Sequence, residues 1–265
     1  MFKTRLISGI ILLGIAIAVI MLGDNVLFGA VIVISLVGMT ELYKLMKIEK
    51  TVLGIVGYLA AIGYFILIYF NLDNYLLLLF IGFLLLLMVS YVIAYPVFRF
   101  EQVITAFFGL FYVSIMLSYI YRVAALEDGG ILVWLIFIGA WGSDTCAYSV
   151  GMLLGKHKLS PKLSPKKSIE GSIGGVIGAA LLGYIYALIT GYKITGIENP
   201  RVLFAIIGAA ASVISQFGDL AASAIKRNYD IKDYGRLIPG HGGILDRFDS
   251  IIFTAPIVYY LALYL

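Results

Sequence analysis

Cysteine, histidine and charged residues are all scarce in this sequence. Its 265 residues include one cysteine, two histidines and 13% charged residues. A single cysteine, Cys146, excludes an intrachain disulfide, and two histidines without a Cys/His cluster argue against a zinc site. The chain also contains neither a GxSxG motif nor a GxxxxGK[ST] motif. We therefore expect neither a Ser/His/Asp hydrolase nor a P-loop protein.

Apolar residues dominate instead, at 62% of the chain. They form many runs of about 18 residues or more, the length of helix that crosses a hydrocarbon layer. Closed barrels are the other structure that satisfies the backbone in lipid, but these runs are too long and continuous for barrel strands. The sequence predicts an all-α polytopic integral membrane protein with about nine transmembrane helices. The spans are expected near residues 6–22, 26–46, 52–70, 75–97, 103–121, 130–154, 172–191, 202–225 and 248–264.

The first span begins after a short basic leader that contains Lys3 and Arg5. This pattern is similar to a signal peptide, but no small-residue cleavage site precedes the charged loop at Asp24. We therefore expect the first helix to be retained. No linker interrupts the first half, so residues 1–125 are predicted to form a transmembrane scaffold, and residues 126–265 a second transmembrane region that carries the polar motifs.

Two features of the first half are interpreted as structural. Glu41 and Lys44 stand three residues apart near the end of the second span, where they can pair on one helix face. Glycines in several spans allow helices to approach one another closely. Small residues on helix faces are also compatible with a homodimer, which the sequence leaves open.

The basic residues are divided unevenly between the two sides of the predicted spans. Of the 19 Lys and Arg residues, only Arg122, Lys193 and Arg201 fall on the side opposite the N-terminus. The positive-inside rule therefore predicts a protein of the cytoplasmic (inner) membrane, with its N-terminus and both large polar loops in the cytoplasm. Because the basic residues form short clusters between apolar spans, membrane topology explains the net charge of +4 better than nucleic-acid binding does.

Chemically informative residues begin in the sixth span. Asp144 lies inside an apolar run, where a carboxylate costs about 2.5–3.5 kcal/mol unless it meets a partner or water. We expect it to face an internal polar cavity that opens to the cytoplasm. The basic loop that follows contains Pro161 and Pro165, which block a helix. Lys166 and Lys167 stand beside the next helix start, where phosphate could meet ammonium and backbone N–H groups together; a solvated loop near acidic headgroups is the alternative.

The stretch Ser215–Ser250 holds the densest group of polar residues in the chain. Asp219, Ser223, Lys226 and Arg227 are spaced i, i+4, i+7 and i+8, so they share one face of a helix that emerges into the cytoplasm. This spacing predicts a polar wall, with a carboxylate at depth, a hydroxyl above it and two cations at the mouth.

A glycine-rich loop and two carboxylates follow that helix. Residues 238–243 read IPGHGG, a flexible backbone that can approach a ligand closely and present N–H groups to an anion. Asp246 and Asp249 stand three apart at the start of the ninth span and can turn to one side. Carboxylates beside Lys, Arg and a glycine-rich loop favour a site for Mg²⁺ and phosphate.

These residues also have structural interpretations. Asp246 or Asp249 could cap the ninth helix, and Asp219 could form a buried ion pair with a lysine. His241 could be a turn residue that donates to a backbone carbonyl. The sequence alone leaves these alternatives open.

Residues 223–249 read SAIKRNYDIKDYGRLIPGHGGILDRFD. Its elements S-x-I-K-R, K-D-x-G and I-P-x-H-G-G-I-x-D-R-x-D, at fixed spacing, resemble the signature of the phosphatidate cytidylyltransferases, or CDP-diacylglycerol synthases. An earlier stretch, with D-x-x-A-Y from Asp144, G-K at 155–156 and S-P-x-K-S-x-E-G at 164–171, resembles the same family. Ser168 stands there where threonine is more usual, and it keeps the hydroxyl. The resemblance covers about residues 140–250, and it implies that residues 126–265 are the catalytic region.

The resemblance implies an enzyme of phospholipid biosynthesis, a nucleotidyltransferase that converts CTP and phosphatidic acid into CDP-diacylglycerol and pyrophosphate with Mg²⁺. A second cation, monovalent or divalent, is left open. The nucleophile is a phosphate monoester that is already ionised at neutral pH, so positioning and charge neutralisation matter more than a strong base.

The resemblance also implies roles for individual residues. The implied metal ligands are Asp219 and Asp246, with Asp144 as a third carboxylate near the site. The implied catalytic residues are Lys167, Ser223, Lys226, Arg227, His241 and Asp249. The implied substrate-binding residues are Lys166, Lys232, Asp233, Gly240, Gly242, Gly243 and Arg247.

Two other functions stay open. A related CTP-using enzyme could act on an ether-lipid phosphate or phosphorylate a polyprenol with similar parts. A secondary transporter could use Asp144 and Asp219 as an ion relay, but that function leaves the motif at residues 223–249 unexplained.

Overall fold

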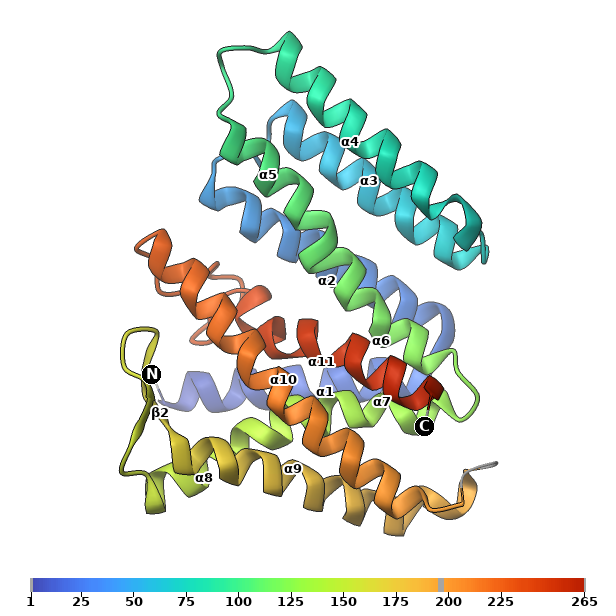
Figure 1. Cartoon of the computed structure of the whole chain (residues 1–265), viewed down its shortest axis with the longest axis vertical. Helices are drawn as coiled ribbons and strands as arrows, with labels where there is room; N and C mark the ends of the chain where they lie inside the picture. The colour runs from blue at the N-terminus through green and yellow to red at the C-terminus, as the bar shows by residue number, and fades with distance from the viewer. Residues whose placement is uncertain (1, 195–197, 265) are drawn as a thin grey trace.

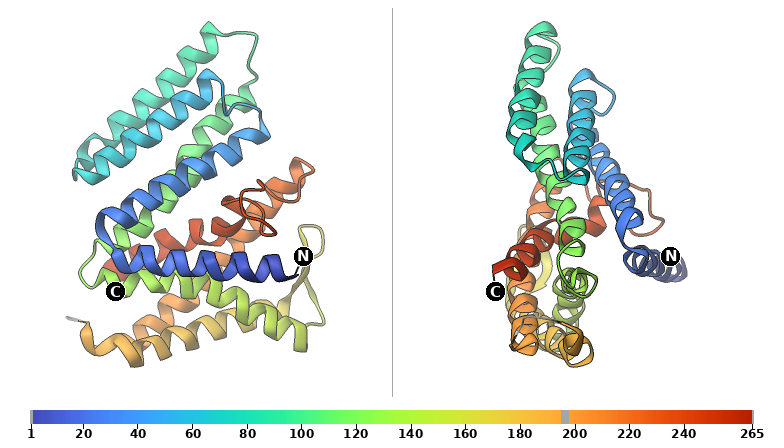
Figure 2. Two further views of the ribbon diagram at one scale, coloured as in Figure 1. Left: turned by 180° about the vertical axis from the view of Figure 1, so that it is seen from behind. Right: turned by 90° about the vertical axis from the view of Figure 1, so that its right-hand side faces the viewer.

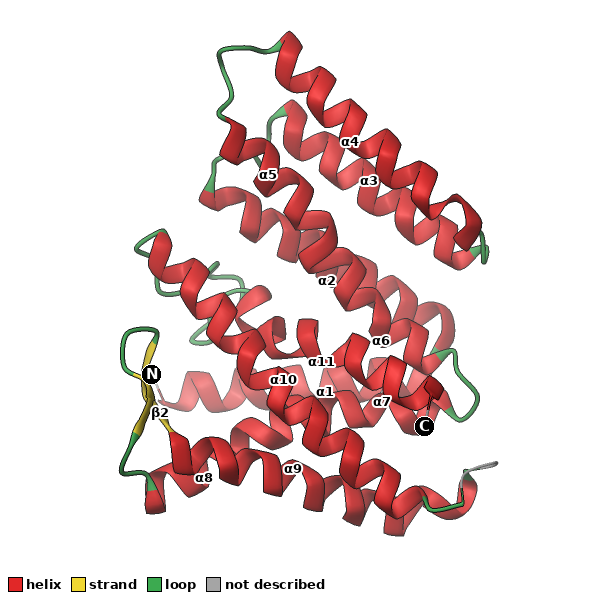
Figure 3. Ribbon diagram, viewed as in Figure 1, coloured by secondary structure: helices red, strands yellow, loops and turns green. Residues whose placement is uncertain are grey.

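The computed structural model describes residues 2–194 and 198–264. Helices make up most of this part of the chain (Figure 3). The elements of the first half are α1 (Phe2–Leu22), α2 (Asp24–Leu45), α3 (Val52–Tyr69), the 3-10 turn η1 (Asp73–Tyr75), α4 (Leu76–Ile93), α5 (Phe100–Gly109), the π-helical η2 (Leu110–Ile115) and α6 (Met116–Ala124).

The second half contains the remaining helices and a small hairpin. Its elements are α7 (Gly129–Phe137), the π-helical η3 (Ile138–Gly142), α8 (Ser143–Leu154), β1 (Lys158–Ser160), β2 (Ser164–Ser168), α9 (Ile169–Thr190), the 3-10 turn η4 (Gly191–Lys193), α10 (Pro200–Asn228) and α11 (Leu245–Tyr264). In both halves a π-helical turn joins two α-helices into one continuous segment, which therefore corresponds to a single predicted span.

Seven helical segments of the described residues are long and apolar enough to cross a membrane. They coincide with the second to the eighth predicted spans. The helices α1 and α11 form where the first and ninth spans were predicted, although α11 carries three charged residues in its first two turns. The membrane character of the chain is thus supported, while the total of nine spans stays a prediction.

The helices run across the molecule between two edges. The N-terminus, the β-hairpin and the end of α10 lie at one edge, and the C-terminus and the connection between α6 and α7 lie at the other (Figures 1 and 2). The helices α3 and α4 form one end of the array and α8 and α9 the opposite end, with α11 between them. The chain therefore gathers its large polar connections at one edge.

The hairpin β1–β2 departs from the expectation of an all-α chain. Its antiparallel strands pair Lys158 with Ser168 and Ser160 with Ser164. Pro161 and Pro165 were expected to block a helix here, and the extended backbone that proline favours suits a strand and its turn. The hairpin returns the chain from the end of α8 to the start of α9, where the Ser168 hydroxyl accepts a hydrogen bond from the Gly171 N–H at 3.1 Å.

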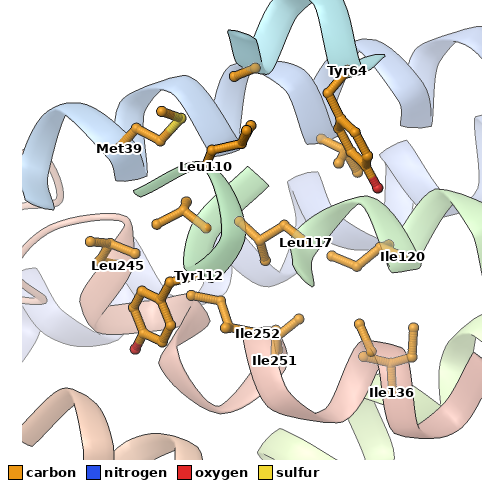
Figure 4. Packing of buried hydrophobic residues seen from close by; sticks show 14 of the residues in the cluster. Met39, Tyr64, Leu110, Tyr112, Leu117, Ile120, Ile136, Leu245, Ile251 and Ile252 are labelled. Atoms are coloured by element: carbon orange, nitrogen blue, oxygen red, sulfur yellow. The ribbon is translucent and has the colours of Figure 1, made fainter. Parts of the chain in front are cut away.

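The buried core continues from the predicted scaffold into the predicted catalytic region. Met39 on α2 and Leu117 on α6 are fully buried, as are Ile251 and Ile252 on α11 (Figure 4). The two regions thus share one apolar core, and α11 packs directly against α6. The first half therefore supports the helix that begins with the signature carboxylates.

Close approach of α9 and α10 depends on glycine. A side chain at Gly208 would place its Cβ 2.5 Å from the carbonyl oxygen of Ala179 on the facing helix. We expect Gly208→Val to destabilise the fold by about 1–3 kcal/mol, because overpacking forces the two helices apart. Thermal unfolding in detergent measures this effect. Gly82→Val is the matched control, since a Cβ at Gly82 meets no atom within 4 Å; equal melting temperatures for both variants would contradict the prediction.

Candidate active site

The crossing of α10 and α11 brings Lys226 to Asp246. The Lys226 Nζ donates to the Asp246 Oδ1 at 2.9 Å, and the side chain of Asp246 is only 2% exposed. The Asp246 Oδ2 accepts backbone N–H groups from Tyr234 at 2.8 Å and Gly243 at 2.9 Å. A lysine and two amides therefore fix one carboxylate at the start of α11, so Asp246 anchors the loop, and its role as a metal ligand stays a prediction.

A second ion pair lies between the hairpin and α10. Lys167, at the end of β2, pairs with Asp219, and both side chains are about three-quarters buried. Asp144 on α8 is in electrostatic range of this pair and of Arg247. The ion pair with a lysine was one of the interpretations left open for Asp219, and the described residues adopt it.

A fourth carboxylate, Asp249, lies one turn after Asp246 on α11. It is 8% exposed, and its Oδ1 accepts the N–H of Ser250 at 2.8 Å. Asp219, Lys226 and Asp144 all act on it electrostatically. Carboxylates from α8, α10 and α11 thus converge, with the neutralising lysines coming from β2 and α10.

Two cavities of different character border this cluster. The signature loop, residues 229–244, connects α10 to α11. It lines a polar cleft of about 660 Å³, with Lys232, Asp233 and Arg236 among the lining residues. A mainly apolar groove of about 800 Å³ lies between α1 and α2 on one side and η3, α8 and α11 on the other. His241 and Arg247 line both cavities. The groove therefore meets the cleft at these two residues.

Three of the four carboxylates line the apolar groove, and none is among the described residues that line the polar cleft. Asp144, Asp246 and Asp249 all line the apolar groove, whose other walls are largely aliphatic. A ligand with an apolar body and an anionic head would have its head beside these residues and Arg247. The arrangement suits an amphipathic ligand on one side and a polar one on the other.

The glycines of the loop have distinct reasons to be glycine. Gly240 and Gly242 adopt φ of 78° and 85°, the left-handed region that side chains disfavour. A Cβ at Gly242 would also lie 2.7 Å from the Asp246 Oδ2. Both residues line the polar cleft, so this part of the loop presents bare backbone to the cleft.

His241 has a partner that the sequence did not indicate. Its Nδ1 lies 2.8 Å from the Ser8 Oγ on α1, and the same hydroxyl donates to the Pro239 carbonyl at 3.0 Å. A lone serine in an apolar run carries no signal that distinguishes it from a packing residue. The contact nevertheless attaches α1 to the signature loop.

Ser223, Arg227 and Lys166 are among the predicted residues that are not joined to the carboxylate cluster. Ser223 is half-buried on α10, while Arg227 and Lys166 are exposed. Among the described residues, no hydrogen bond or ion pair connects any of them to Asp144, Asp219, Asp246 or Asp249. Their predicted contacts with phosphate stay predictions.

Tyr234 and Glu41 were missed as site residues. Burial raises the pKa of the Tyr234 hydroxyl, with Tyr112, Asp249 and Asp246 adding to the shift, so it stays neutral and donates to the Ala222 carbonyl at 3.2 Å.

The predicted pairing of Glu41 with Lys44 was wrong: within the described residues they form no ion pair, and Glu41 accepts backbone N–H groups of the signature loop instead. The reason is that Glu41 lies on the buried side of α2, which faces the loop, whereas Lys44 is exposed.

The donor set suits a hard divalent cation. Within residues 2–194 and 198–264, no three His, Cys, Asp or Glu side chains are already grouped to hold a metal ion. Mg²⁺ commonly uses only one or two carboxylates together with waters and substrate phosphates, so a ready-made triad is not required. Asp219, Asp246 and Asp144 fit such a set, and their assignment as ligands stays a prediction.

Comparison with known proteins gives a consistent result. A family model described as the cytidylyltransferase family matches residues 3–265. A phosphatidate cytidylyltransferase of Bacillus subtilis is 32% identical over 98% of this chain and 97% of its own length. One from Staphylococcus saprophyticus is 31% identical over 97% of both chains, and one from Rickettsia prowazekii is 36% identical over 59% of this chain and 69% of its own. The similarity therefore extends over the whole chain, well beyond the signature.

Proposed function

Since the chain belongs to the cytidylyltransferase family, we propose that the carboxylate cluster between its two cavities is where CTP and phosphatidic acid react to give CDP-diacylglycerol and pyrophosphate. The enzyme is a CTP:phosphatidate cytidylyltransferase of phospholipid biosynthesis. In the reaction, a phosphate oxygen of phosphatidic acid attacks the α-phosphorus of CTP. The new P–O–P bond forms as the bond to the β-phosphate breaks.

The meeting of an apolar groove with a polar cleft is the observation that carries this proposal. The groove of about 800 Å³ suits acyl chains, and the cleft of about 660 Å³ suits a nucleoside triphosphate. Both cavities include Arg247 and His241. A lipid phosphate at the end of the groove and the triphosphate in the cleft therefore meet beside Asp246.

Charge neutralisation is the main task of the site, because the two substrates are both polyanions. Lys226 and Lys167, now paired with Asp246 and Asp219, carry positive charge directly beside the carboxylates. Arg247 lines both cavities and can contact either phosphate. Binding of phosphates draws these cations partly away from their carboxylates.

Mg²⁺ would be held by Asp219 and Asp246, with Asp144 as a third carboxylate close by. When bound, it would neutralise phosphoryl oxygens and favour departure of pyrophosphate. Once Lys167 and Lys226 turn toward the substrate phosphates, the negative charges of Asp219 and Asp246 would offset the charge of the ion. A second cation and a homodimer stay open.

The location proposed is the cytoplasmic membrane, with the N-terminus, the hairpin and the signature loop facing the cytoplasm. These segments share one edge of the molecule (Figure 1), and together with the residues that border them they contain most of its Lys and Arg residues. This orientation agrees with the positive-inside rule. It lets CTP arrive from water while phosphatidic acid enters from the bilayer, which is the partner of the apolar helices.

Removal of divalent metal is expected to stop the reaction. Purified protein in detergent is incubated with phosphatidic acid, α-labelled CTP and Mg²⁺, with or without EDTA, and label is followed into the organic phase. We expect metal-dependent labelling of lipid, restored when excess Mg²⁺ is added back. Label that is insensitive to EDTA would overturn the Mg²⁺ assignment.

Parallel assays distinguish the alternatives. Transfer from γ-labelled CTP to a polyprenol would indicate a kinase, and labelling of an ether-lipid phosphate in preference to phosphatidic acid would indicate the related transferase. Absence of any lipid label in folded protein would overturn the proposed function.

A further inference from the structure

We propose that Glu41, on α2 in the first half of the chain, is a positioning residue for the cytidylyl-transfer site. The inference rests on the proposed function. Glu41 is not among the described residues that line the polar cleft or the apolar groove, so it acts on the reaction through the residues it holds.

The carboxylate of Glu41 caps the start of α11. Its Oε1 accepts the N–H of Ile244 at 3.0 Å, and its Oε2 accepts the N–H of Leu245 at 2.9 Å. These amides belong to the first turn of a helix, where no intrahelical acceptor is available and the helix dipole favours a negative charge. Glu41 is only 3% exposed, and both of its carboxylate oxygens accept hydrogen bonds from this one short segment.

The signature loop closes around this carboxylate with two glycines. A Cβ at Gly243 would lie 2.5 Å from the Glu41 Cδ, and a Cβ at Gly235 would lie 2.9 Å from the same atom. A side chain at either position would have to displace the Glu41 carboxylate or the loop backbone. The close fit explains why both positions are glycine. It also shows that Glu41 lies against two separate parts of the loop, at Gly235 and at Gly243.

The segment held by Glu41 is the one that holds Asp246. Leu245 immediately precedes Asp246, and the Gly243 N–H donates to the Asp246 Oδ2 at 2.9 Å. The three consecutive amides of residues 243–245 are therefore divided between the two carboxylates. A displacement of Ile244 and Leu245 would move Asp246 relative to Lys226. It would also move Asp249, which lies one turn further along α11.

The arrangement is more than generic packing. A carboxylate in a membrane-spanning helix is costly, and an apolar residue of similar size would fill the same space. What only the carboxylate provides is two charge-assisted acceptors for adjacent amides, which fix the loop's orientation as well as its position.

The test compares Glu41→Gln, Glu41→Ala and the control Glu101→Gln in the assay with α-labelled CTP. Glutamine keeps the volume and one acceptor but turns an NH₂ group toward the second amide. We expect its kcat to fall at least about tenfold and the Mg²⁺ concentration for half-maximal activity to rise, with little change in KM for phosphatidic acid. The kcat of Glu41→Ala should fall further than that of Glu41→Gln. Glu101 lies at the exposed start of α5, so Glu101→Gln should have the wild-type kcat.

The folded fraction of each variant is measured by thermal unfolding and size exclusion, and rates are compared per amount of folded protein. A Glu41→Gln protein with wild-type kcat and wild-type Mg²⁺ dependence would overturn the inference. So would a loss that only tracks the folded fraction, since a merely structural role does not change the Mg²⁺ requirement. A wild-type protein that transfers no label would instead overturn the proposed function, and this inference with it.

A double-mutant cycle with Gly243→Ala tests the contact itself. The added methyl group alone should reduce kcat because it collides with Glu41. In Glu41→Ala the collision is absent, so the double variant should resemble Glu41→Ala rather than show the product of the two losses. Independent, multiplicative losses would mean that the two residues do not act on each other and would contradict the proposal.

Discussion

Asp246→Asn is expected to lower kcat on the order of 10²–10³-fold, the size of effect seen when one preorganised electrostatic group is removed from an active site. Asp246 is the carboxylate at which the lysine of α10, two loop amides and the predicted metal meet. Asparagine keeps the shape of the side chain and removes its charge. The measurement is transfer of α-labelled CTP to phosphatidic acid at several Mg²⁺ concentrations.

Stability separates the chemical role of Asp246 from its structural role. Asparagine leaves Lys226 without a counter-charge in a site where its side chain is 13% exposed, so the single variant should also be less stable. Combining it with Lys226→Met removes the unpaired charge and should restore the melting temperature without restoring activity. Recovery of activity in the double variant would contradict the catalytic assignment.

A distant carboxylate provides the control. Asp73 forms an ion pair with Arg122 at 2.8 Å on the side of the molecule away from the signature loop. Asp73→Asn removes the same charge and is expected to keep wild-type kcat. A comparable loss at Asp73 would mean that net charge, rather than position, determines the rate.

Lys167→Met is expected to reduce kcat by about 100-fold, because it removes a cation from the junction of two polyanionic substrates. In the structure this lysine neutralises Asp219 and lies in electrostatic range of Asp144. Without it the carboxylates repel incoming phosphates. The loss should be measured at saturating CTP, so that a change in kcat is separated from a change in KM.

The basic hairpin supplies matched controls for Lys167. Lys162 lies in the same hairpin but is exposed, so Lys162→Met should keep wild-type kcat. Lys167→Arg preserves the charge but not the compact ammonium group, and it should recover only part of the rate. Equal losses at Lys162 and Lys167 would indicate that the hairpin acts through general attraction to anionic lipid rather than at the reacting phosphates.

The site divides into residues that local sequence could identify and residues that it could not. Asp246 and Lys226 could be selected because they stand close together in a motif with a recognisable chemistry. Ser8 and Glu41 could not, since nothing near them in the sequence indicates their partners: Ser8 is a serine beside an apolar run, and Glu41 stands three residues from Lys44. Their partners are more than 200 positions away: the residue numbers of Ser8 and His241 differ by 233, and those of Glu41 and Ile244 by 203.

Secondary structure followed the same division. The apolar runs predicted the positions of the long helices because hydrophobic length and backbone hydrogen bonding are local requirements in lipid. The strands of the hairpin were missed because each is short and is stabilised by its pairing with the other. Pro161 and Pro165 indicated only that no helix could form there.

The sequence by itself determined that the chain is a membrane protein built from apolar helices and that its chemistry lies in residues 144–249. Only the tertiary structure decided which lysine pairs with which carboxylate, that Glu41 holds the start of α11, and that an apolar groove meets a polar cleft at His241 and Arg247. The physical reason is range. Helix formation depends on neighbours within a few residues, whereas these pairings depend on the crossing and register of helices distant in the chain.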